Sequence, residues 1–246
     1  MGTAHVLEAL RSLTNECVSV IVTSDKCYEN LEIKRGYCEN DRLGGKDPYS
    51  ASKVAAESAV DVWRKVSEQT GGPQIFSVRA GNVIGGGDWS KDRLIPDIAK
   101  ALNANKEVVI RNPKAVRPWQ HVIEPLFGYL ELGLKLNSDP IKYAQAYNFG
   151  PNTNDALSVE EMVVKSINFW ASGTYNVEVN SNNPHEAGFL KLDITKATTE
   201  LNWKPVLNAQ TAVELTINWY KNYYNNTTAT ELMESDIEYY QSKINE

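Results

Sequence analysis

Two side chains near the start of a predicted helix could together transfer a proton. Tyr49 and Lys53 lie four residues apart in the segment DPYSASK, residues 47–53, and residues at that spacing share one face of a helix. Free tyrosine titrates at about 10, too high for a base at neutral pH, but a neighbouring ammonium group favours the phenolate. The two residues are therefore candidates for proton transfer with a hydroxyl group. The alternative is an ordinary pair on a solvated helix, which the spacing alone favours.

A second group of polar residues follows a predicted strand. Residues 18–23 are a short, mainly β-branched run that indicates a buried strand, and Thr23, Ser24, Asp25 and Lys26 stand at its end. In open α/β sheets, ligands bind at the carboxyl ends of the strands. A carboxylic acid there could protonate a leaving hydroxyl group, and a lysine could accept a proton. The alternative, which the residues alone favour, is a polar turn after a buried strand.

A glycine-rich segment follows another predicted strand. Residues 79–89 read RAGNVIGGGDW, and small residues let a ligand approach the backbone closely. The glycines do not form a dinucleotide fingerprint, because G-x-G-x-x-G beginning at Gly85 would need glycine where Ser90 stands. The alternative is a flexible turn.

Three arginines are candidates for binding a phosphate. Arg93, Arg111 and Arg117 could each make a bidentate contact with a phosphate group. Arg117 is close in sequence to Trp119, so a charge and an aromatic face come together, as a nucleotide would require. Taken singly, each arginine is more often an ordinary surface residue.

Alternating strands and helices must hold these groups. In the first half we predict a helix over 3–13, strands over 18–23 and 75–79, a long loop over 29–47 and a helix over 48–65. This alternation indicates a parallel α/β sheet. The later predicted helices cover 94–102, 124–136, 159–170, a short stretch capped by Asp193 and ending near Leu201, 209–224 and part of the tail from 227; the later strands cover 108–110, 146–149 and 177–179.

Composition excludes several classes of function. The 246 residues carry a net charge of −6, which argues against nucleic-acid binding, and no apolar run reaches membrane-spanning length. No signal peptide is visible, and the three cysteines form no C-x-x-C pair, so we expect reduced thiols in a cytoplasmic protein. The three histidines are far apart, so we expect no metal site.

Five sequence blocks together resemble the extended short-chain dehydrogenase/reductase family, whose members act on nucleotide sugars. The resemblance runs from the first residue to about Tyr224 and is carried by residues 24–30, 43–50, 80–89, 117–122 and 184–187. Within the family the blocks look like those of the 4,6-dehydratases of CDP-glucose. In most related sugar-nucleotide dehydratases the aspartate is followed by glutamate, whereas here Asp25 is followed by Lys26.

The resemblance implies a partial Rossmann-like, doubly wound parallel sheet with a smaller C-terminal α+β substrate-binding domain. We expect residues 1–88, with elements around 120–150, in the NAD-binding part, 89–226 mainly in the nucleotide-sugar domain, and 227–246 as a tail. Family members begin with a strand, a G-x-x-G-x-x-G turn and a helix that hold the cofactor pyrophosphate. This sequence shows no such segment, so we expect the chain alone to be aggregation-prone and not to bind NAD productively.

The implied reaction is the conversion of CDP-glucose to CDP-4-keto-6-deoxyglucose and water with bound NAD, in deoxysugar and O-antigen precursor biosynthesis. By resemblance, Tyr49 removes the proton of the 4-hydroxyl, Lys53 supports the tyrosine, and Ser24 hydrogen-bonds the same hydroxyl. Asp25 protonates the departing 6-hydroxyl, and Lys26 is the candidate for removing the proton of carbon 5.

The resemblance also implies binding residues and partners. Those implied for the cofactor are Thr23, Tyr49, Lys53, Ala80 and Gly81, and those for the substrate are Asn82, Arg93, Arg111, Arg117, His185 and Glu186. We expect a homo-oligomer at full length, with no nucleic-acid or membrane partner. Two alternatives remain: another epimerase or dehydratase of the family, which the Asp25–Lys26 pair disfavours, and an inactive truncated fragment.

Overall fold

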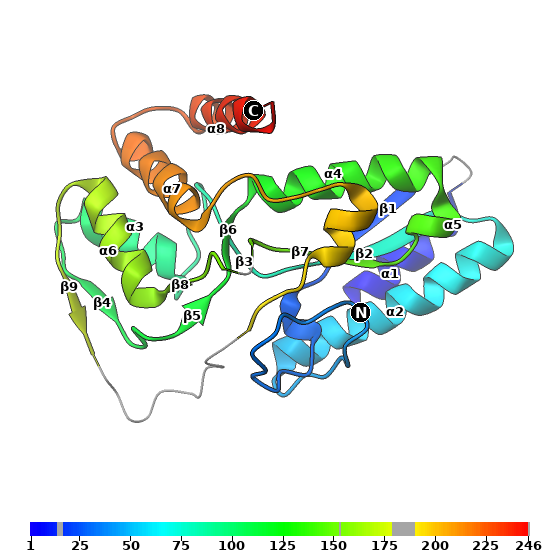
Figure 1. Ribbon diagram of the computed structural model, residues 1–246. Coiled ribbons are helices and arrows are strands. Elements are labelled where there is room, and N and C mark those ends of the chain that lie inside the picture. The colour runs from blue at the N-terminus through cyan, green and yellow to red at the C-terminus, as the bar shows by residue number, and fades with distance from the viewer. Residues whose placement is uncertain (14–16, 153, 179–189, 246) are drawn as a thin grey trace. The chain divides into compact units, whose positions relative to one another are not determined.

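The computed structural model describes residues 1–13, 17–152, 154–178 and 190–245 (Figure 1). In these ranges the helices are α1 Gly2–Leu10, α2 Pro48–Thr70, α3 Leu94–Asn103, α4 Ile123–Ser138, α5 Pro140–Tyr143, α6 Val159–Trp170, α7 Ala209–Tyr224 and α8 Ala229–Ile244, with short turns η1 Asp25–Cys27 and η2 Ala197–Leu201. The strands are β1 Val18–Val22, β2 Gln74–Ala80, β3 Asn82–Ile84, β4 Val108–Ile110, β5 Val116–Arg117, β6 Trp119–His121, β7 Ala146–Phe149, β8 Leu157–Ser158 and β9 Tyr175–Val177.

The chain forms two compact units, and neither is continuous in sequence. Unit 1 contains Met1–Gly81, Pro125–Gly150 and Leu190–Lys204; unit 2 contains Asn82–Glu124, Pro151–Phe189 and Pro205–Glu246. From the sequence alone, we expect the first boundary at residue 88 and a separate tail. The structure divides the chain at Gly81, because β3 pairs in parallel with β6 of unit 2 and does not continue the sheet of unit 1.

Unit 1 is built on a parallel sheet in the order β1-β2-β7. The central strand β2 is buried along nearly its whole length, as expected for a parallel strand covered on both faces. Leu7 of α1 and Val60 of α2 pack with Ile75 on one face. Leu132 of α4 packs with Phe76 on the other (Figure 1). This confirms the predicted α/β class.

The helix α2 begins at the predicted residue and ends later than predicted. Asp47 caps it by accepting from the backbone N–H groups of Tyr49 and Ser50 at 2.9 and 3.1 Å, and Pro48 occupies its first turn. It continues to Thr70 because the first left-handed residue is Gly71, with φ 68°. Tyr49 and Lys53 therefore lie in the first two turns of a long, firmly started helix.

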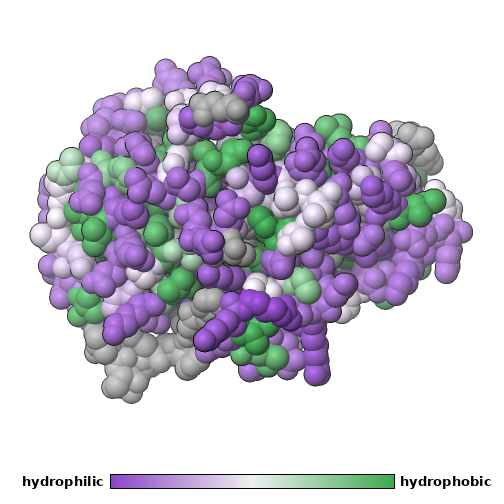
Figure 2. All heavy atoms as spheres, viewed as in Figure 1, coloured by the Kyte–Doolittle hydropathy of each residue, from purple (hydrophilic) through white to green (hydrophobic). Residues whose placement is uncertain are grey.

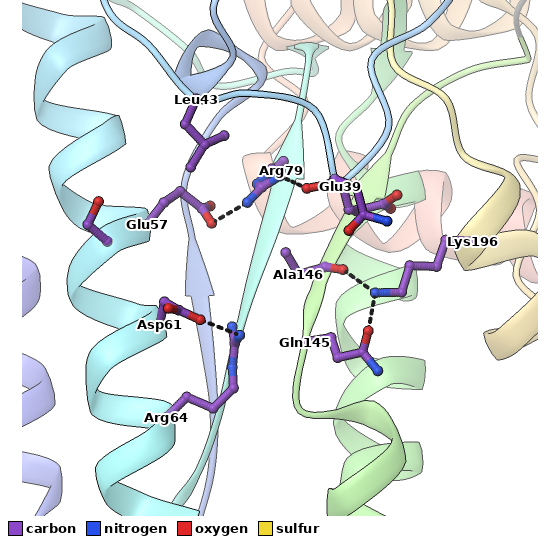
Figure 3. A pocket seen from close by; sticks show the side chains of 11 residues that line it. Glu39, Leu43, Glu57, Asp61, Arg64, Arg79, Gln145, Ala146 and Lys196 are labelled. Atoms are coloured by element: carbon purple, nitrogen blue, oxygen red, sulfur yellow. Dashed lines mark hydrogen bonds and ion pairs between the residues drawn. The ribbon is translucent and has the colours of Figure 1, made fainter.

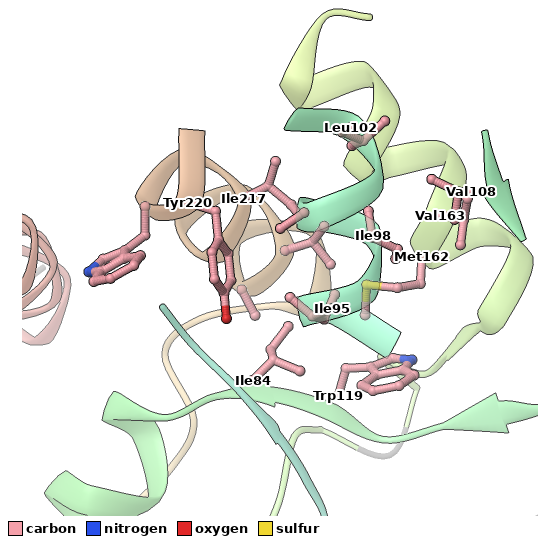
Figure 4. Packing of buried hydrophobic residues seen from close by; sticks show 14 of the residues in the cluster. Ile84, Ile95, Ile98, Leu102, Val108, Trp119, Met162, Val163, Ile217 and Tyr220 are labelled. Atoms are coloured by element: carbon pink, nitrogen blue, oxygen red, sulfur yellow. The ribbon is translucent and has the colours of Figure 1, made fainter. Parts of the chain in front are cut away.

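Unit 2 has its own hydrophobic core (Figure 4), formed by α3, α6 and α7 with short two-stranded sheets. Trp119 lies in this core, only 6% exposed, and its indole N–H donates to the Leu157 carbonyl at 3.2 Å. The aromatic face expected beside Arg117 is thus packed against the protein and not open to a base. Packing is also tight at Gly86, where a Cβ atom would overlap the Trp219 ring.

The face in Figure 2 is mainly hydrophilic, with hydrophobic residues scattered over it. In the part of the chain that the structure describes, no helix is long and apolar enough to cross a membrane.

Candidate active site

The predicted proton-transfer pair lies at the exposed start of α2. Tyr49 is 52% exposed, and the Lys53 ammonium lies 5.6 Å from the centre of its ring. The hydrogen bond from the Ser50 hydroxyl is the main cause that lowers the pKa of Asp47, followed by backbone hydrogen bonds. A charged Asp47 at the helix N-terminus is stabilised by the helix dipole, which keeps this turn in place. The two side chains thus share a face and reach solvent together.

The Ser24–Asp25–Lys26 group forms a compact hydrogen-bonded unit at the end of β1. The Ser24 hydroxyl donates to one oxygen of Asp25 at 3.0 Å, and the Lys26 ammonium donates to the other at 3.0 Å. Asp25 is 2% exposed, whereas the Lys26 side chain is 41% exposed. A buried carboxylate therefore touches a lysine that reaches the surface, an arrangement suited to proton exchange between them.

The turn η1 brings this group next to α2. The two elements pack against each other in unit 1, and the Lys26 charge contributes to lowering the pKa of Asp47, which caps α2. Between them, Cys27 is fully buried, and burial raises the pKa of its thiol to about 12. Cys27 is therefore a protonated packing residue at neutral pH and not a nucleophile.

Behind the two groups lies a buried ion pair that the sequence analysis does not predict. Arg79 donates to Glu57 at 2.7 Å, and both side chains are at most 5% exposed. The only sequence signal is that Glu57 continues the four-residue spacing of Tyr49 and Lys53. Arg79 also donates to the Tyr28 hydroxyl at 2.9 Å and to the Glu39 carbonyl at 3.1 Å.

The residues expected at the cofactor have different surroundings. Thr23 is buried, with its hydroxyl within hydrogen-bonding distance of a Glu57 oxygen and its backbone N–H bonded to the Val78 carbonyl at 2.9 Å. Ala80 is the last residue of β2, and Gly81 follows it. Both therefore lie at the carboxyl end of β2, the region where ligands bind in such sheets.

The residues expected at the substrate belong to unit 2. Asn82 begins β3 and is half-buried, Arg93 stands at the exposed N-cap of α3, Arg111 is exposed after β4, and Arg117 is half-buried in β5. His185 and Glu186 lie outside the described residues. The predicted catalytic and cofactor residues are thus gathered in unit 1, and the described substrate candidates in unit 2.

A cavity of about 370 Å³ opens in unit 1 beside the buried ion pair (Figure 3). Glu57 and Arg79 line it from α2 and β2, and Lys196 lines it from the other side, donating to Gln145 at 2.7 Å and to the Ala146 carbonyl at 3.0 Å. Most of the residues that line it are charged or polar. Acidic and basic side chains are equal in number among them.

A parallel sheet with polar side chains at the carboxyl end of β1 and a Tyr-x-x-x-Lys helix beside it defines a Rossmann-like α/β fold. The sequence model of the family described as GDP-mannose 4,6 dehydratase matches residues 1–216. The chain belongs to that family.

Curated relatives of the chain include two nucleotide-sugar dehydratases from one organism. It is 44% identical over 226 residues to CDP-glucose 4,6-dehydratase of Salmonella typhimurium, covering 90% of this chain and 63% of the relative. It is 25% identical over 218 residues to dTDP-glucose 4,6-dehydratase of the same organism, covering 81% and 56%. The chain therefore spans less than two thirds of the length of these relatives.

The solved structures share the fold. A point mutant of UDP-glucuronic acid 4-epimerase from Bacillus cereus gives a TM-score of 0.75 at 19% identity, covering 90% of this chain and 67% of that one. The dTDP-glucose 4,6-dehydratase of Bacillus anthracis, solved in complex with NAD, gives 0.71 at 20% identity, covering 90% and 67%.

Proposed function

We propose that this chain carries the catalytic residues of a CDP-glucose 4,6-dehydratase, which converts CDP-glucose to CDP-4-keto-6-deoxyglucose and water. The proposal rests mainly on the Asp25–Lys26 pair. The ammonium and the carboxylate lie 3.0 Å apart, and the pair lies beside the helix that carries Tyr49 and Lys53. The 44% identity to the Salmonella enzyme of that name supports the choice of substrate. Loss of water requires an acid and a base, and this pair supplies both.

The residues of unit 1 fit NAD as the cofactor. A phenol and an ammonium, both reaching solvent at the start of α2, are suitable partners for the hydroxyl groups of a nicotinamide ribose. At the carboxyl end of β2, Ala80 has a small side chain and Gly81 has none, so a ligand can approach the backbone there. When bound, NAD would accept a hydride from carbon 4 of the sugar and return it to carbon 6. The structural relative from Bacillus anthracis was solved with NAD.

In the oxidation half of the reaction, we assign Tyr49 as the base that accepts the proton of the sugar's 4-hydroxyl group. Its phenolate would accept the proton of the 4-hydroxyl, and the Lys53 ammonium, 5.6 Å from the ring centre, would stabilise that phenolate. The Ser24 hydroxyl would hydrogen-bond the same sugar hydroxyl and hold it in reach. The ketone formed at carbon 4 then acidifies the proton on carbon 5.

In the elimination half, the ion pair at 3.0 Å provides the acid and the base together. Movement of one proton from Lys26 to Asp25 converts ammonium and carboxylate into a neutral amine and a neutral acid. Lys26 then takes the proton of carbon 5, and Asp25 gives its proton to the 6-hydroxyl, which leaves as water. This restores the ion pair. When hydride returns to carbon 6, the Lys26 ammonium would give a proton back to carbon 5, and because ammonium hydrogens exchange with water, that proton comes from the solvent. The proton that Tyr49 accepts from the 4-hydroxyl is released to the solvent in exchange, so the reaction gains and loses no proton overall.

We assign the nucleotide part of the substrate to unit 2. Asn82, Arg93, Arg111 and Arg117 supply an amide and three guanidinium groups, which suit a diphosphate. His185 and Glu186 complete the set by their sequence resemblance alone. Because Trp119 is buried, we assign no stacking role to it.

The assembly and location belong to the same proposal. We propose a cytoplasmic homo-oligomer, supported by half-exposed apolar side chains on two adjacent helices, Val6 of α1 and Val62 of α2. Sedimentation velocity of the protein would test it, and a monomer at micromolar concentration would contradict it.

The function is tested by incubating the protein, expressed from its complete gene, with CDP-glucose and NAD. Mass spectrometry should find a sugar nucleotide lighter by one water, and in deuterium oxide this product should carry deuterium at carbon 5. A product epimerised at carbon 4 with no loss of water would support an epimerase instead. No conversion at all would contradict the proposal.

A further inference from the structure

One face of α2 carries three functional side chains at four-residue intervals. Tyr49 is 52% exposed, Lys53 is half-buried, and Glu57 is 4% exposed. Residues at this spacing lie above one another along the helix. The face therefore runs from the exposed catalytic pair directly into the interior of unit 1, where it ends in a carboxylate.

The Glu57 carboxylate joins α2 to two strands. One oxygen is within hydrogen-bonding distance of the Thr23 hydroxyl, and Thr23 immediately precedes Ser24. The other oxygen accepts from Ser77 at 2.9 Å and from Arg79 at 2.7 Å, both in β2. A single side chain thus connects the helix of Tyr49 to the strand end of Ser24.

The pair is charged although it is buried. Burial is the largest single influence and by itself raises the pKa of Glu57. The hydrogen bond and charge of Arg79, together with the hydrogen bonds of Thr23 and Ser77, outweigh burial and lower that pKa. Arg79 is held in turn by Tyr28, whose hydroxyl donates to Asn148 of β7 at 2.7 Å. These successive hydrogen bonds therefore connect Glu57 to all three strands of the sheet.

Packing alone does not hold Glu57 at this point. Glu57 and Arg79 line the cavity of about 370 Å³, and Leu43 is one of only two apolar residues in its lining (Figure 3). Where apolar side chains do not fill the space, directional hydrogen bonds set the position of a helix. With an apolar pair here, this directional link would be lost, and apolar contacts such as that of Val60 with Ile75 would still hold α2 on the sheet.

We propose that Glu57, paired with Arg79, is a positioning residue that fixes Tyr49 and Lys53 against the Ser24–Asp25–Lys26 group. The inference rests on the proposed function, because it assumes that these groups act on one substrate. A displacement of about 1 Å can lower turnover by roughly 100-fold, so a tether of this kind has a direct consequence for rate.

The experiment compares stability and turnover in three variants. Glu57→Leu removes the carboxylate and leaves Arg79 buried without it. Glu57→Leu combined with Arg79→Met removes both charges, and Glu57→Gln keeps an oxygen that can accept from Thr23. Glu68→Gln, at an exposed position of the same helix, is the control.

We expect Glu57→Leu to lower both the unfolding midpoint and turnover. The double variant should regain most of the midpoint, because no buried charge is left unpaired, while kcat stays about 10- to 100-fold below wild type and KM changes less than about twofold. Glu57→Gln should keep more turnover than Glu57→Leu. Turnover that returns together with stability in the double variant would overturn the proposal.

A second measurement does not depend on activity. Amide hydrogen exchange at residues 25–27 and 47–53 should be faster in the double variant than in wild type, even where their unfolding midpoints agree. Equal exchange would overturn the proposal. If wild type does not convert CDP-glucose, the proposed function fails, and exchange still decides whether Glu57 fixes these segments.

Discussion

At the scale of single residues, the same pattern occurs twice with different surroundings. Lys53 lies 5.6 Å from the centre of the Tyr49 ring in α2, and Lys243 lies 5.8 Å from that of Tyr239 in α8. Only the first pair lies on a helix that packs against η1 at the end of a sheet strand. Spacing alone could not separate the two pairs, whereas the sequence blocks around Tyr49 could.

These two pairs allow a matched test. Tyr49→Phe removes the phenol and keeps the ring, so turnover should fall by roughly 100-fold or more, because general acid–base groups contribute about that much. Substrate affinity should change little. Tyr239→Phe is the control and should leave turnover unchanged. Near-normal kcat in Tyr49→Phe, measured with CDP-glucose, would remove Tyr49 from the mechanism.

A buried histidine in unit 2 predicts a pH dependence of stability. Burial lowers the pKa of His121 from 6.5 to about 4, and the Asp236 carboxylate, 3.8 Å away, is beyond hydrogen-bonding distance. The neutral form is favoured in the fold, so this stability is present above pH 6.5 and is lost as pH falls towards 4. Burial raises the pKa of Asp236 to about 6, which acts in the opposite direction.

The comparison of His121→Gln with wild type isolates the histidine, because Asp236 is common to both. The difference in their free energies of unfolding should shrink by about 3 kcal/mol between pH 7 and pH 4, at 1.36 kcal/mol per pH unit of pKa shift. His5→Gln, at an exposed position of α1, serves as the control. A difference that does not change with pH would show that His121 titrates normally. Urea unfolding across this pH range is the measurement.

At the scale of elements, the long periodic segments were predictable, whereas four of the very short strands were missed. The predicted helices over 159–170 and 209–224 are confirmed, as are the strands over 108–110 and 146–149. The two- and three-residue strands β3, β5, β6 and β8 were missed because they are too short to show an alternating pattern. The predicted strand over 177–179 lies at 175–177 as far as the described residues extend.

Some helix ends lie at residues that favour a left-handed backbone conformation. Asn202 adopts a left-handed conformation with φ 60° after η2, a position where asparagine can serve in place of glycine. The contact between Glu57 and Thr23 could not be predicted, because it joins residues 34 positions apart through the packing of a helix on a sheet.

Two glycines of the same helix should respond oppositely to alanine. In α4, a Cβ atom at Gly128 would overlap the Phe149 ring of β7, whereas at Gly133 it meets no atom of the described residues within 4 Å. Gly128→Ala should destabilise by roughly 1–3 kcal/mol through overpacking. Gly133→Ala should stabilise by about 0.5–1 kcal/mol, because alanine is the better helix former. Chemical unfolding measures the change in the free energy of unfolding for both variants. Changes of the same sign would contradict the packing of α4 on β7.

At the scale of the whole molecule, both units are assembled from separated segments. Unit 1 takes Leu192 and Trp203 from its last segment, Leu190–Lys204, into two of its hydrophobic clusters. Segment order of this kind is visible in the sequence only through resemblance, because no composition change marks the crossings. The family and the α/β class were therefore predictable, while the boundary at Gly81 was not.

This organisation predicts the fate of a fragment. Residues 1–150 retain β1, β2 and β7 but lack Leu190–Lys204, so Phe149 loses its edge-on contact with Trp203. We expect the fragment to lose cooperative urea unfolding and near-UV circular dichroism, and to gain them when residues 190–204 are joined to it by a flexible linker. Cooperative unfolding of the fragment by itself would contradict the assignment of the last segment to unit 1.

The central claim is that Tyr49 and Lys53 serve oxidation at carbon 4, whereas Asp25 and Lys26 serve the loss of water. The most direct test is a single-turnover experiment with CDP-glucose and NAD that follows reduced nicotinamide by absorbance and the 4-keto-6-deoxy product by mass spectrometry. Asp25→Asn should still reduce the nicotinamide at a rate close to that of wild type, while product formation slows by roughly 100-fold or more. Tyr49→Phe should slow both signals together, by roughly 100-fold or more. If Asp25→Asn slows the nicotinamide signal as much as Tyr49→Phe does, the division of roles is contradicted.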